Sequence, residues 1–294
     1  MSRRIRVIAP AKVNLHLSVG ALRDDGYHDL EGVFHALELA DEVVVEAGEG
    51  LSVVCEPDVG VPAEQNLAFR AAVAFADDVG VAPDFRITVR KRIPHGAGLG
   101  GGSSDAAAVL RALAHAFGLN ADDTRVLGAA RSVGADVAFF LGGGAALMGG
   151  RGDELVRTLP ALNTPVAIVK PDRSISTALA YAVFDTEPQP PADPGPVVAA
   201  LEAADARGLG RALANNLAPV ACALVPECGE VLDWLAEQPG LWGTTVAGSG
   251  SAVLALAESD AKAHDIAQAA RDRGWWGIGT RLRARGVEVI GEED

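Results

Sequence analysis

The chain has few of the residues that cross-link a fold or carry it through a membrane. Its 294 residues include three cysteines, Cys55, Cys222 and Cys228, an odd number without CxxC spacing. This count excludes a disulfide scaffold and a zinc ribbon and indicates buried or incidental thiols in a reducing compartment. No apolar run approaches the roughly 18 residues of a transmembrane helix, and Pro10 interrupts the short apolar stretch near the start. We therefore expect a cytoplasmic protein with no signal peptide and no membrane partner.

Basic residues are also scarce. Lysine and arginine number 25 against 39 acidic residues, which gives a net charge of −14. Nucleic-acid binders and proteins of anionic membrane surfaces usually carry the opposite balance, so neither partner is expected. Net charge describes the whole surface, however, and a local phosphate site remains compatible with it. The sequence has only four lysines, so the position of each is informative: Lys12, Lys91, Lys170 and Lys262.

The length and the hydrophobic pattern predict an α+β protein of two domains, residues 1–155 and 156–294. In the first part, alternation predicts a half-buried strand over 13–19 whose polar face carries Lys12, Asn14 and His16. Further strands are expected at 43–47 and 51–55, joined as a hairpin across Gly48–Gly50, and at 85–89. Helical spacing indicates helices over 66–78, 106–117 and 122–133.

The second part has a strand pattern at 166–170 and a helix pattern at 174–184. Five of the sixteen prolines lie in 186–196, which must be a loop. The remaining pattern predicts helices over 197–238, strands at 244–246 and 253–256, and a helix over 260–273.

The most informative segment is the glycine segment, residues 94–105, which has five glycines in the seven positions 96–102. Glycine lets the backbone approach a ligand and adopt positive φ angles. The segment leads directly into a predicted helix, with Ser103 or Ser104 as its N-cap and Gly118 after its end. Free N–H groups and the dipole at a helix N-terminus attract phosphate. A flexible turn followed by an ordinary serine cap is the alternative.

Three other phosphate loops fit this segment less well. A Walker A loop needs lysine where Ser103 stands. Gly96, Gly98 and Gly101 match a Rossmann GxGxxG, with Asp122 about twenty residues on, but the next predicted element is a helix instead of the required strand. A protein-kinase loop would need HRD and DFG motifs, which the sequence lacks.

Residues Pro94–Ala106 resemble the second motif of the GHMP kinases. Pro10–Leu17 and Asp25–Leu30 resemble the opening of one family within them, the 4-diphosphocytidyl-2-C-methyl-D-erythritol kinases. Gly134–Leu141 is similar to the central acidic motif of that family. Ala247–Ser251 is similar to its third glycine motif, where the family usually has serine at the position of Ala247. The motifs occur in the family's order along nearly the whole chain.

The resemblance implies a two-domain GHMP kinase fold with the active site in the cleft between the domains. It implies an ATP-dependent kinase, with Mg²⁺ accompanying ATP, that phosphorylates the 2-hydroxyl of a cytidine diphosphate substrate in the non-mevalonate route to isoprenoid precursors. It assigns nucleotide binding to a continuous run: Pro94, His95, Gly96, Ala97, Gly98, Leu99, Gly100, Gly101, Gly102, Ser103 and Ser104. No dedicated metal cluster is expected; either serine could contact Mg²⁺.

The resemblance also implies that Asp136 accepts the proton of the substrate hydroxyl and that Lys12 holds the hydroxyl and the aspartate. From the residues alone, Asp136 is equally well an N-cap after Gly134, and a solvated position on a strand face is favoured for Lys12. Asn14 is a predicted substrate contact.

An aromatic pair in a turn, Tyr27 and His28, is implied to belong to the cytidine pocket, and Tyr181 to lie over the cytosine. An aromatic face and imidazole nitrogens suit a base chemically. His35, His115 and His264 have no partner at metal-ligand spacing, so we expect them to be structural. Three alternatives remain: a GHMP kinase for homoserine or a mevalonate compound, an NAD(P)-dependent oxidoreductase, and a non-catalytic nucleotide-binding protein. The sequence does not indicate an oligomeric state.

Overall fold

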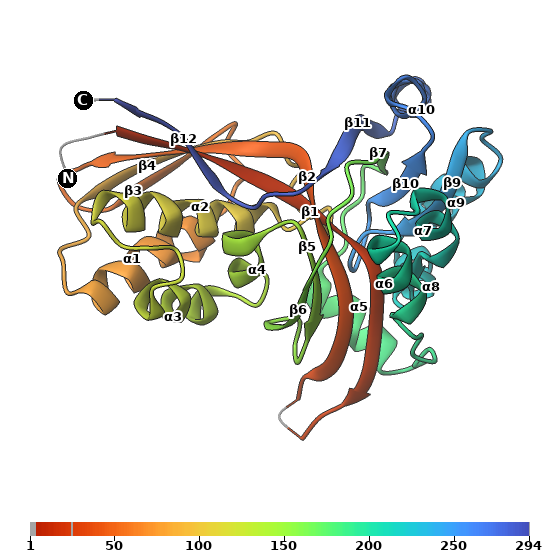
Figure 1. Cartoon of the computed structure of the whole chain (residues 1–294), viewed down its shortest axis with the longest axis horizontal. Helices are drawn as coiled ribbons and strands as arrows, with labels where there is room; N and C mark the ends of the chain where they lie inside the picture. Colours follow the sequence, from red (N-terminus) through yellow and green to blue (C-terminus); the bar gives the residue numbers. More distant parts are fainter. Residues whose placement is uncertain (1–3, 25, 294) are drawn as a thin grey trace.

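The computed structural model describes residues 4–24 and 26–293. Two lobes are joined by one long antiparallel pair of strands, β1 (Arg4–Leu22) and β2 (His28–Ala47) (Figure 1). All strands belong to one 12-stranded sheet, whose main path runs β12-β1-β2-β11-β7-β10-β9. The mixture of helices and strands confirms the α+β class.

In the first lobe, four helices cover one face of the sheet (Figure 1): α1 (Leu67–Val79), α2 (Gly101–Ala116), α3 (Thr124–Val133) and α4 (Val137–Gly142). The sheet here contains β1, β2, β4 (Phe85–Arg90) and β3 (Ser52–Glu56). Inward side chains such as Val7, Val45 and Ile87 are fully buried against the helices. The period-two alternation of these strands thus builds one core under one face.

The predicted hairpin around Gly48–Gly50 is wrong. Strand β4 lies between β2 and β3, antiparallel to the first and parallel to the second. The turn wraps the start of β4 instead, since Gly48 N–H donates to the carbonyl of Asp84 and Gly50 N–H to its side chain. The alternating pattern identified the strands at 43–47 and 51–55, but it carried no information about which strand pairs with each of them.

The second lobe is a helix-covered extension of the same sheet. Its strands are β7 (Pro165–Lys170), β9 (Leu241–Val246), β10 (Val253–Ala257) and β11 (Trp276–Arg283). Its helices are α5 (Thr177–Phe184), α6 (Gly195–Glu202), α7 (Ala206–Ala212), α8 (Ala218–Leu224), α9 (Glu227–Ala236) and α10 (Asp260–Asp272). Shorter strands complete the sheet: β5 (Ala145–Gly149), β6 (Glu154–Leu159), β8 (Ala214–Asn215) and β12 (Glu288–Glu293).

Strand β1 is buried on both faces, so the prediction of a solvated polar face is wrong. Lys12 is 5% exposed, Asn14 1% and His16 0%. The reason is long range: β2 pairs in turn with β4, β11 and β5, and both lobes therefore close over the middle of the β1–β2 pair. Two of these buried polar side chains, Lys12 and Asn14, are hydrogen-bonded to each other.

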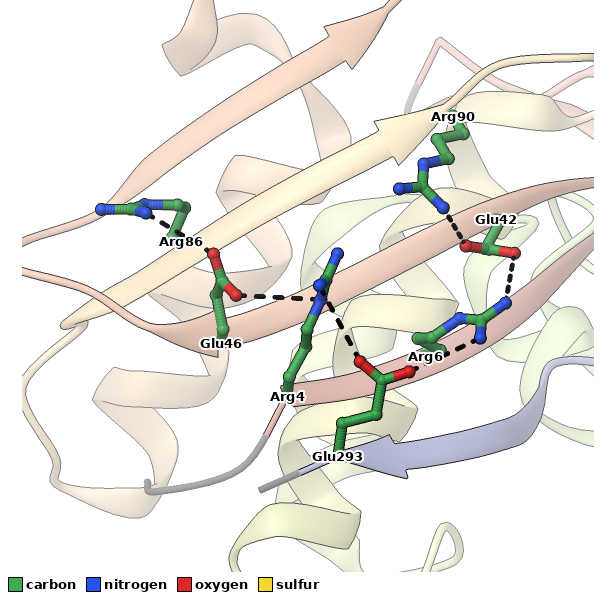
Figure 2. A network of polar contacts seen from close by, with 7 residues as sticks. All are labelled: Arg4, Arg6, Glu42, Glu46, Arg86, Arg90 and Glu293. Atoms are coloured by element: carbon green, nitrogen blue, oxygen red, sulfur yellow. Dashed lines mark hydrogen bonds and ion pairs between the residues drawn. The ribbon is translucent and has the colours of Figure 1, made fainter.

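The outer face of the first lobe carries a ladder of ion pairs (Figure 2). Glu42 contacts Arg6 at 3.2 Å and Arg90 at 2.7 Å, and Glu293 of β12 contacts Arg4 and Arg6 at 3.9 and 3.8 Å. The pairs join β4, β2, β1 and β12 across the strands (Figure 2). Single exposed pairs stabilise a fold little, so the ladder mainly sets the register of the last strand.

In the described residues no helix is long and apolar enough to cross a membrane. The predicted division near residue 155 falls in β6, and β11 and β12 return to pair with β2 and β1.

Candidate active site

A cavity of about 910 Å³ lies between the lobes. The first lobe contributes Lys12, the glycine segment and Asp136, and the second contributes Tyr181 and Gly248. This volume is in the range of small-molecule sites. Every residue predicted for the site lines it except Ser104: Lys12, Asn14, Tyr27, His28, Pro94, His95, Gly96, Ala97, Gly98, Leu99, Gly100, Gly101, Gly102, Ser103, Asp136 and Tyr181.

The glycine segment is shaped by close packing on both sides. Gly98 has φ +77°, and a Cβ there would lie 2.3 Å from the carbonyl oxygen of Ala247. Gly100 has φ +70°, and its Cβ would lie 2.8 Å from Cζ of Phe140. The backbone N–H of Lys12 donates to the carbonyl of Leu99 at 2.9 Å. The segment is thus held between β1, α4 and the third glycine motif (residues 247–251).

The prediction that Ser103 or Ser104 caps the helix is wrong. Helix α2 begins at Gly101 with Gly100 as its N-cap, and the N–H of Ser104 already donates to the Gly100 carbonyl. Ser103 lines the cavity. Ser104 is fully buried, and its hydroxyl has no hydrogen-bond partner in residues 4–24 and 26–293. The helix starts earlier because left-handed Gly100 provides the turn without a side-chain cap.

Lys12 and Asp136 meet in the cavity although they are 124 positions apart. The ammonium of Lys12 lies 3.5 Å from Oδ2 of Asp136 and donates to Oδ1 of Asn14 at 2.7 Å. It also lies over the ring of Phe34, 4.6 Å from the centroid. The Asp136 side chain is 27% exposed, so a small molecule can reach the carboxylate that the buried lysine faces.

The N-cap role considered for Asp136 has no support in the structure. Asp136 precedes α4, but its side chain makes no cap hydrogen bond and its φ and ψ are −76° and −13°. Asp123, by contrast, caps α3 by accepting from the N–H of Arg125. A free carboxylate at a helix start, opposite a buried lysine, is available for chemistry.

Aromatic side chains also line the cavity. The His28 ring stacks on Tyr181 with centroids 5.5 Å apart and an interplanar angle of 29°. Its Nδ1 contacts the carbonyl of Gly20 at 3.0 Å, and its Nε2 lies 3.0 Å from Oδ1 of Asp185. Burial, with the charge of Asp136 adding, raises the pKa of Tyr181 to about 12, so its hydroxyl stays protonated.

Tyr27, the second predicted aromatic, is 53% exposed at the cavity edge. The guanidinium of Arg151 lies 4.7 Å from its ring centroid. Asp25, in the same turn, lies outside the described residues. Tyr27 and the His28–Tyr181 stack therefore present flat surfaces to one end of the cavity, remote in sequence from the glycine segment.

A buried acid–lysine–acid cluster beneath the glycine segment was missed from the sequence. Lys91 Nζ donates to Oδ2 of Asp41 at 2.5 Å and to Oδ2 of Asp105 at 2.6 Å. Asp41 also accepts from the N–H groups of Arg92 and Ile93. The cluster thus fastens both ends of the segment to β2. The scarcity of lysine and its position three residues before Pro94 were the available signals.

Burial and pairing oppose each other in this cluster. Burial raises the pKa of Asp105 to about 7 despite the lysine beside it. Burial works against the charge of Lys91, but the two carboxylates outweigh it and hold the pKa of the lysine above its ordinary value. The cluster therefore keeps Lys91 charged next to the predicted phosphate site.

The three lone histidines lie outside the cavity. His35 is fully buried, with Nδ1 near the carbonyl of Ala36 and Nε2 accepting from the N–H of Leu162. His115 and His264 are on helices α2 and α10. In the described part of the chain, no group of three His, Cys, Asp or Glu could hold a metal ion.

Two family models match the chain. The GHMP kinases N terminal domain matches residues 66–144 and the GHMP kinases C terminal domain matches residues 197–274. The first interval contains the glycine segment and Asp136, and the second contains the third glycine motif.

Relatives of similar length carry one name. The 4-diphosphocytidyl-2-C-methyl-D-erythritol kinase of Mycolicibacterium smegmatis is 40% identical over 96% of this chain and 87% of its own. That of Desulfitobacterium hafniense is 36% identical over 96% of this chain and 97% of its own.

Solved structures of the same fold are found in the same group of kinases. A crystal structure of 4-(cytidine 5'-diphospho)-2C-methyl-D-erythritol kinase has a TM-score of 0.79 at 38% identity, covering 95% of this chain and all of that one. The homoserine kinase of Cytophaga hutchinsonii has a TM-score of 0.78 at 23% identity, with 99% and 98% coverage, and shares the fold.

Proposed function

The chain belongs to the 4-diphosphocytidyl-2-C-methyl-D-erythritol kinase family, and we propose that Lys12, Asp136 and the glycine segment carry out its phosphoryl transfer. The protein is an ATP-dependent kinase that phosphorylates the 2-hydroxyl of 4-diphosphocytidyl-2-C-methyl-D-erythritol in the non-mevalonate isoprenoid pathway. The names of its relatives favour this substrate over homoserine or a mevalonate compound.

Asp136 is the general base in this proposal. Its carboxylate accepts the proton of the 2-hydroxyl as the oxygen attacks the γ-phosphorus of ATP, and ADP leaves in line. Lys12, 3.5 Å away, orients the carboxylate and places its ammonium beside the attacking oxygen. Asn14 fixes the lysine by accepting from its ammonium at 2.7 Å, so the pair is positioned before substrate arrives.

The glycine segment fits the ATP phosphates. Gly98 and Gly100 have positive φ angles and no side chains, so a ligand can approach their backbone closely. The first N–H groups of α2 have no acceptor within the helix and are available to phosphate oxygens. For Mg²⁺ the fit is partial: Ser103 and Asp136 offer oxygens on the cavity wall, consistent with a metal held chiefly by phosphates and water. When bound, Mg²⁺ neutralises charge on the phosphates.

The aromatic end of the cavity takes the cytidine. Tyr27 and Tyr181 offer ring faces on which the base can stack. His28 also lines the cavity, where the carbonyl of Gly20 and the carboxylate of Asp185 hold its ring against Tyr181. Asn14, beside the lysine, contacts the methylerythritol part. This order places the ATP phosphates and the cytidine against different parts of one cavity wall, so that the γ-phosphate and the 2-hydroxyl meet between them beside Asp136.

The observation that carries the proposal is the approach of Lys12 and Asp136 to each other in the wall of the cavity that the glycine segment also lines. Asp136→Asn keeps the shape and removes the base. We expect kcat to fall by about 10²–10⁴-fold, the contribution of a positioned general base, with little change in ATP affinity. ADP release measured with the cytidine diphosphate substrate, homoserine and mevalonate phosphate tests the role and the substrate together.

Asp123→Ala is the matched control, because Asp123 caps α3 and lies outside the cavity. We expect Asp123→Ala to lower the melting temperature and preserve kcat. Asp136→Asn, in contrast, lowers kcat and preserves the melting temperature. Near-normal kcat in Asp136→Asn would remove Asp136 from the chemistry. Turnover of homoserine without turnover of the cytidine compound would reject the substrate.

Three broader expectations belong to the same proposal. The enzyme works in the cytoplasm on small molecules, without a nucleic-acid partner. The two proposed domains are residues 1–155 and 156–294, with the cavity at their junction and with β12, from the second, paired to β1 in the first lobe.

A further inference from the structure

A second cavity, of about 510 Å³, lies at the far end of the helices that carry the active site. It is lined by the last turns of α2 and α4 and by residues 284–289, which comprise the connection from β11 and the start of β12. Helix α2 starts at the glycine segment, and α4 starts immediately after Asp136. The cavity is thus separate from the catalytic one and shares its two supporting helices.

Arg111 is the distinctive residue of this cavity. Its guanidinium is half-buried and desolvated, which lowers its pKa, and no carboxylate of residues 4–24 and 26–293 lies within 4 Å of it. Nη2 donates to the carbonyl of Leu141 at 2.8 Å, and the buried Nε has no partner in those residues. Partial burial of a guanidinium without a counter-ion costs free energy of folding, and a bound anion would offset that cost. The lack of an acidic partner in the described residues is notable in a chain of net charge −14.

The other charges around the cavity leave a positive balance. Arg285 is 73% exposed at the rim, and Glu288 on the wall is shared between Arg285 at 2.6 Å and Arg283 at 2.7 Å. His115, four residues after Arg111 and on the same helix face, lies 3.5 Å from Glu292. Two arginines, Arg111 and Arg285, and one acid, Glu288, therefore line the cavity.

We propose that this cavity binds a small phosphate-bearing anion, with Arg111 as the buried anchor and Arg285 as the rim contact. The volume exceeds what one phosphate needs, and the two arginines lie on different elements of the wall, so a diphosphate suits it best. Because Arg111 also donates to the carbonyl of Leu141 in the last turn of α4, the anion settles against the contact that joins α2 to α4.

The test is calorimetric titration of the full-length enzyme with inorganic diphosphate, at constant ionic strength, with and without saturating ADP. We expect one binding event that ADP does not compete away. Arg111→Gln weakens it at least 10-fold, and Arg285→Gln weakens it several-fold. Arg131→Gln is the matched control: it removes an exposed charge from α3, outside the cavity, and leaves the affinity unchanged.

Arg285 is exposed, so its variant reports on the site even where Arg111→Gln fails to fold. Absence of binding in the presence of ADP would overturn the proposal. Equal weakening in Arg131→Gln would overturn it as well, because the attraction would then belong to the general charge of the surface.

Discussion

The packing of the glycine segment against the third glycine motif makes one substitution especially informative. Gly98 has φ +77°, and a Cβ there would stand 2.3 Å from the Ala247 carbonyl oxygen and 3.1 Å from that of Gly250. Both obstacles are backbone atoms, which cannot rotate away as a side chain can. In Gly98→Ala the two glycine motifs must therefore move apart.

The expected magnitude follows from two costs. The left-handed conformation costs an alanine about 1–2 kcal/mol. The overlap with Ala247 adds to this, because a contact of 2.3 Å cannot persist. If the segment moves to relieve it, N–H groups aimed at the phosphates lose alignment, and about 1.4 kcal/mol of lost binding is tenfold in affinity. We expect the KM for ATP to rise at least tenfold, with a smaller change in the KM for the cytidine substrate.

Gly102→Ala is the control within the same segment. Gly102 is helical, and its Cβ would meet only Cδ1 of Leu67, at the ordinary contact distance of 3.6 Å. Alanine in a helix stabilises by about 0.5–1 kcal/mol relative to glycine, so this variant should melt at a higher temperature. Steady-state kinetics and thermal melting of both variants decide the matter. An unchanged KM for ATP and an unchanged melting temperature in Gly98→Ala would refute the packing argument.

The remaining predictions concern single side chains. Burial lowers the pKa of His35 from 6.5 to about 4, so its contribution to the free energy of unfolding is complete above pH 6.5 and falls by about 3 kcal/mol as the pH falls towards 4. Urea denaturation of His35→Gln should lack this loss, and an equal loss in the variant would assign the pH dependence to other groups. Tyr27→Ala should raise the KM for the cytidine substrate about 5–100-fold, as expected for one lost base stack, and leave the KM for ATP unchanged; equal changes in both would make Tyr27 structural. Brief acylation followed by mass spectrometry should label Lys262 well before Lys12, and labelling of both at one rate would contradict the burial of Lys12.

Short-range patterns in the sequence were sufficient for most elements. The helix predicted over 66–78 is observed one residue later, with Asn66 as its cap and left-handed Gly80 at its end. The loop predicted over 186–196 has no helix or strand as far as Pro194, and α6 begins at Gly195. Such elements follow from local backbone chemistry, which a window of a few residues contains. The glycine segment belongs to this class, because its composition already demanded positive φ angles.

Features that depend on long-range pairing could not be predicted in this way. The partner of β3, the burial of both faces of β1 and the return of β12 to the first lobe depend on residues many positions away. The same holds for the site: Lys12 and Asp136 were chosen by resemblance, and their 3.5 Å approach is a property of the closed fold. The role of Ala247 is also clearer, since it meets Gly98 through its carbonyl, which serine would present equally.

The scarcity of lysine acquires a physical meaning in the structure. Lysine is almost never buried unless it is paired, yet three of the four lysines are at least nine-tenths buried. Lys12 faces the carboxylate of Asp136, and Lys91 fastens both ends of the glycine segment. Lys170 donates to the carbonyls of Pro171 and Asp172, directly after β7. Arginine supplies the exposed positive charge instead, as in the ladder of Figure 2. An acidic surface is therefore compatible with the proposed phosphate site, because Lys12 and Lys91, the lysines that line its cavity, are inside the fold.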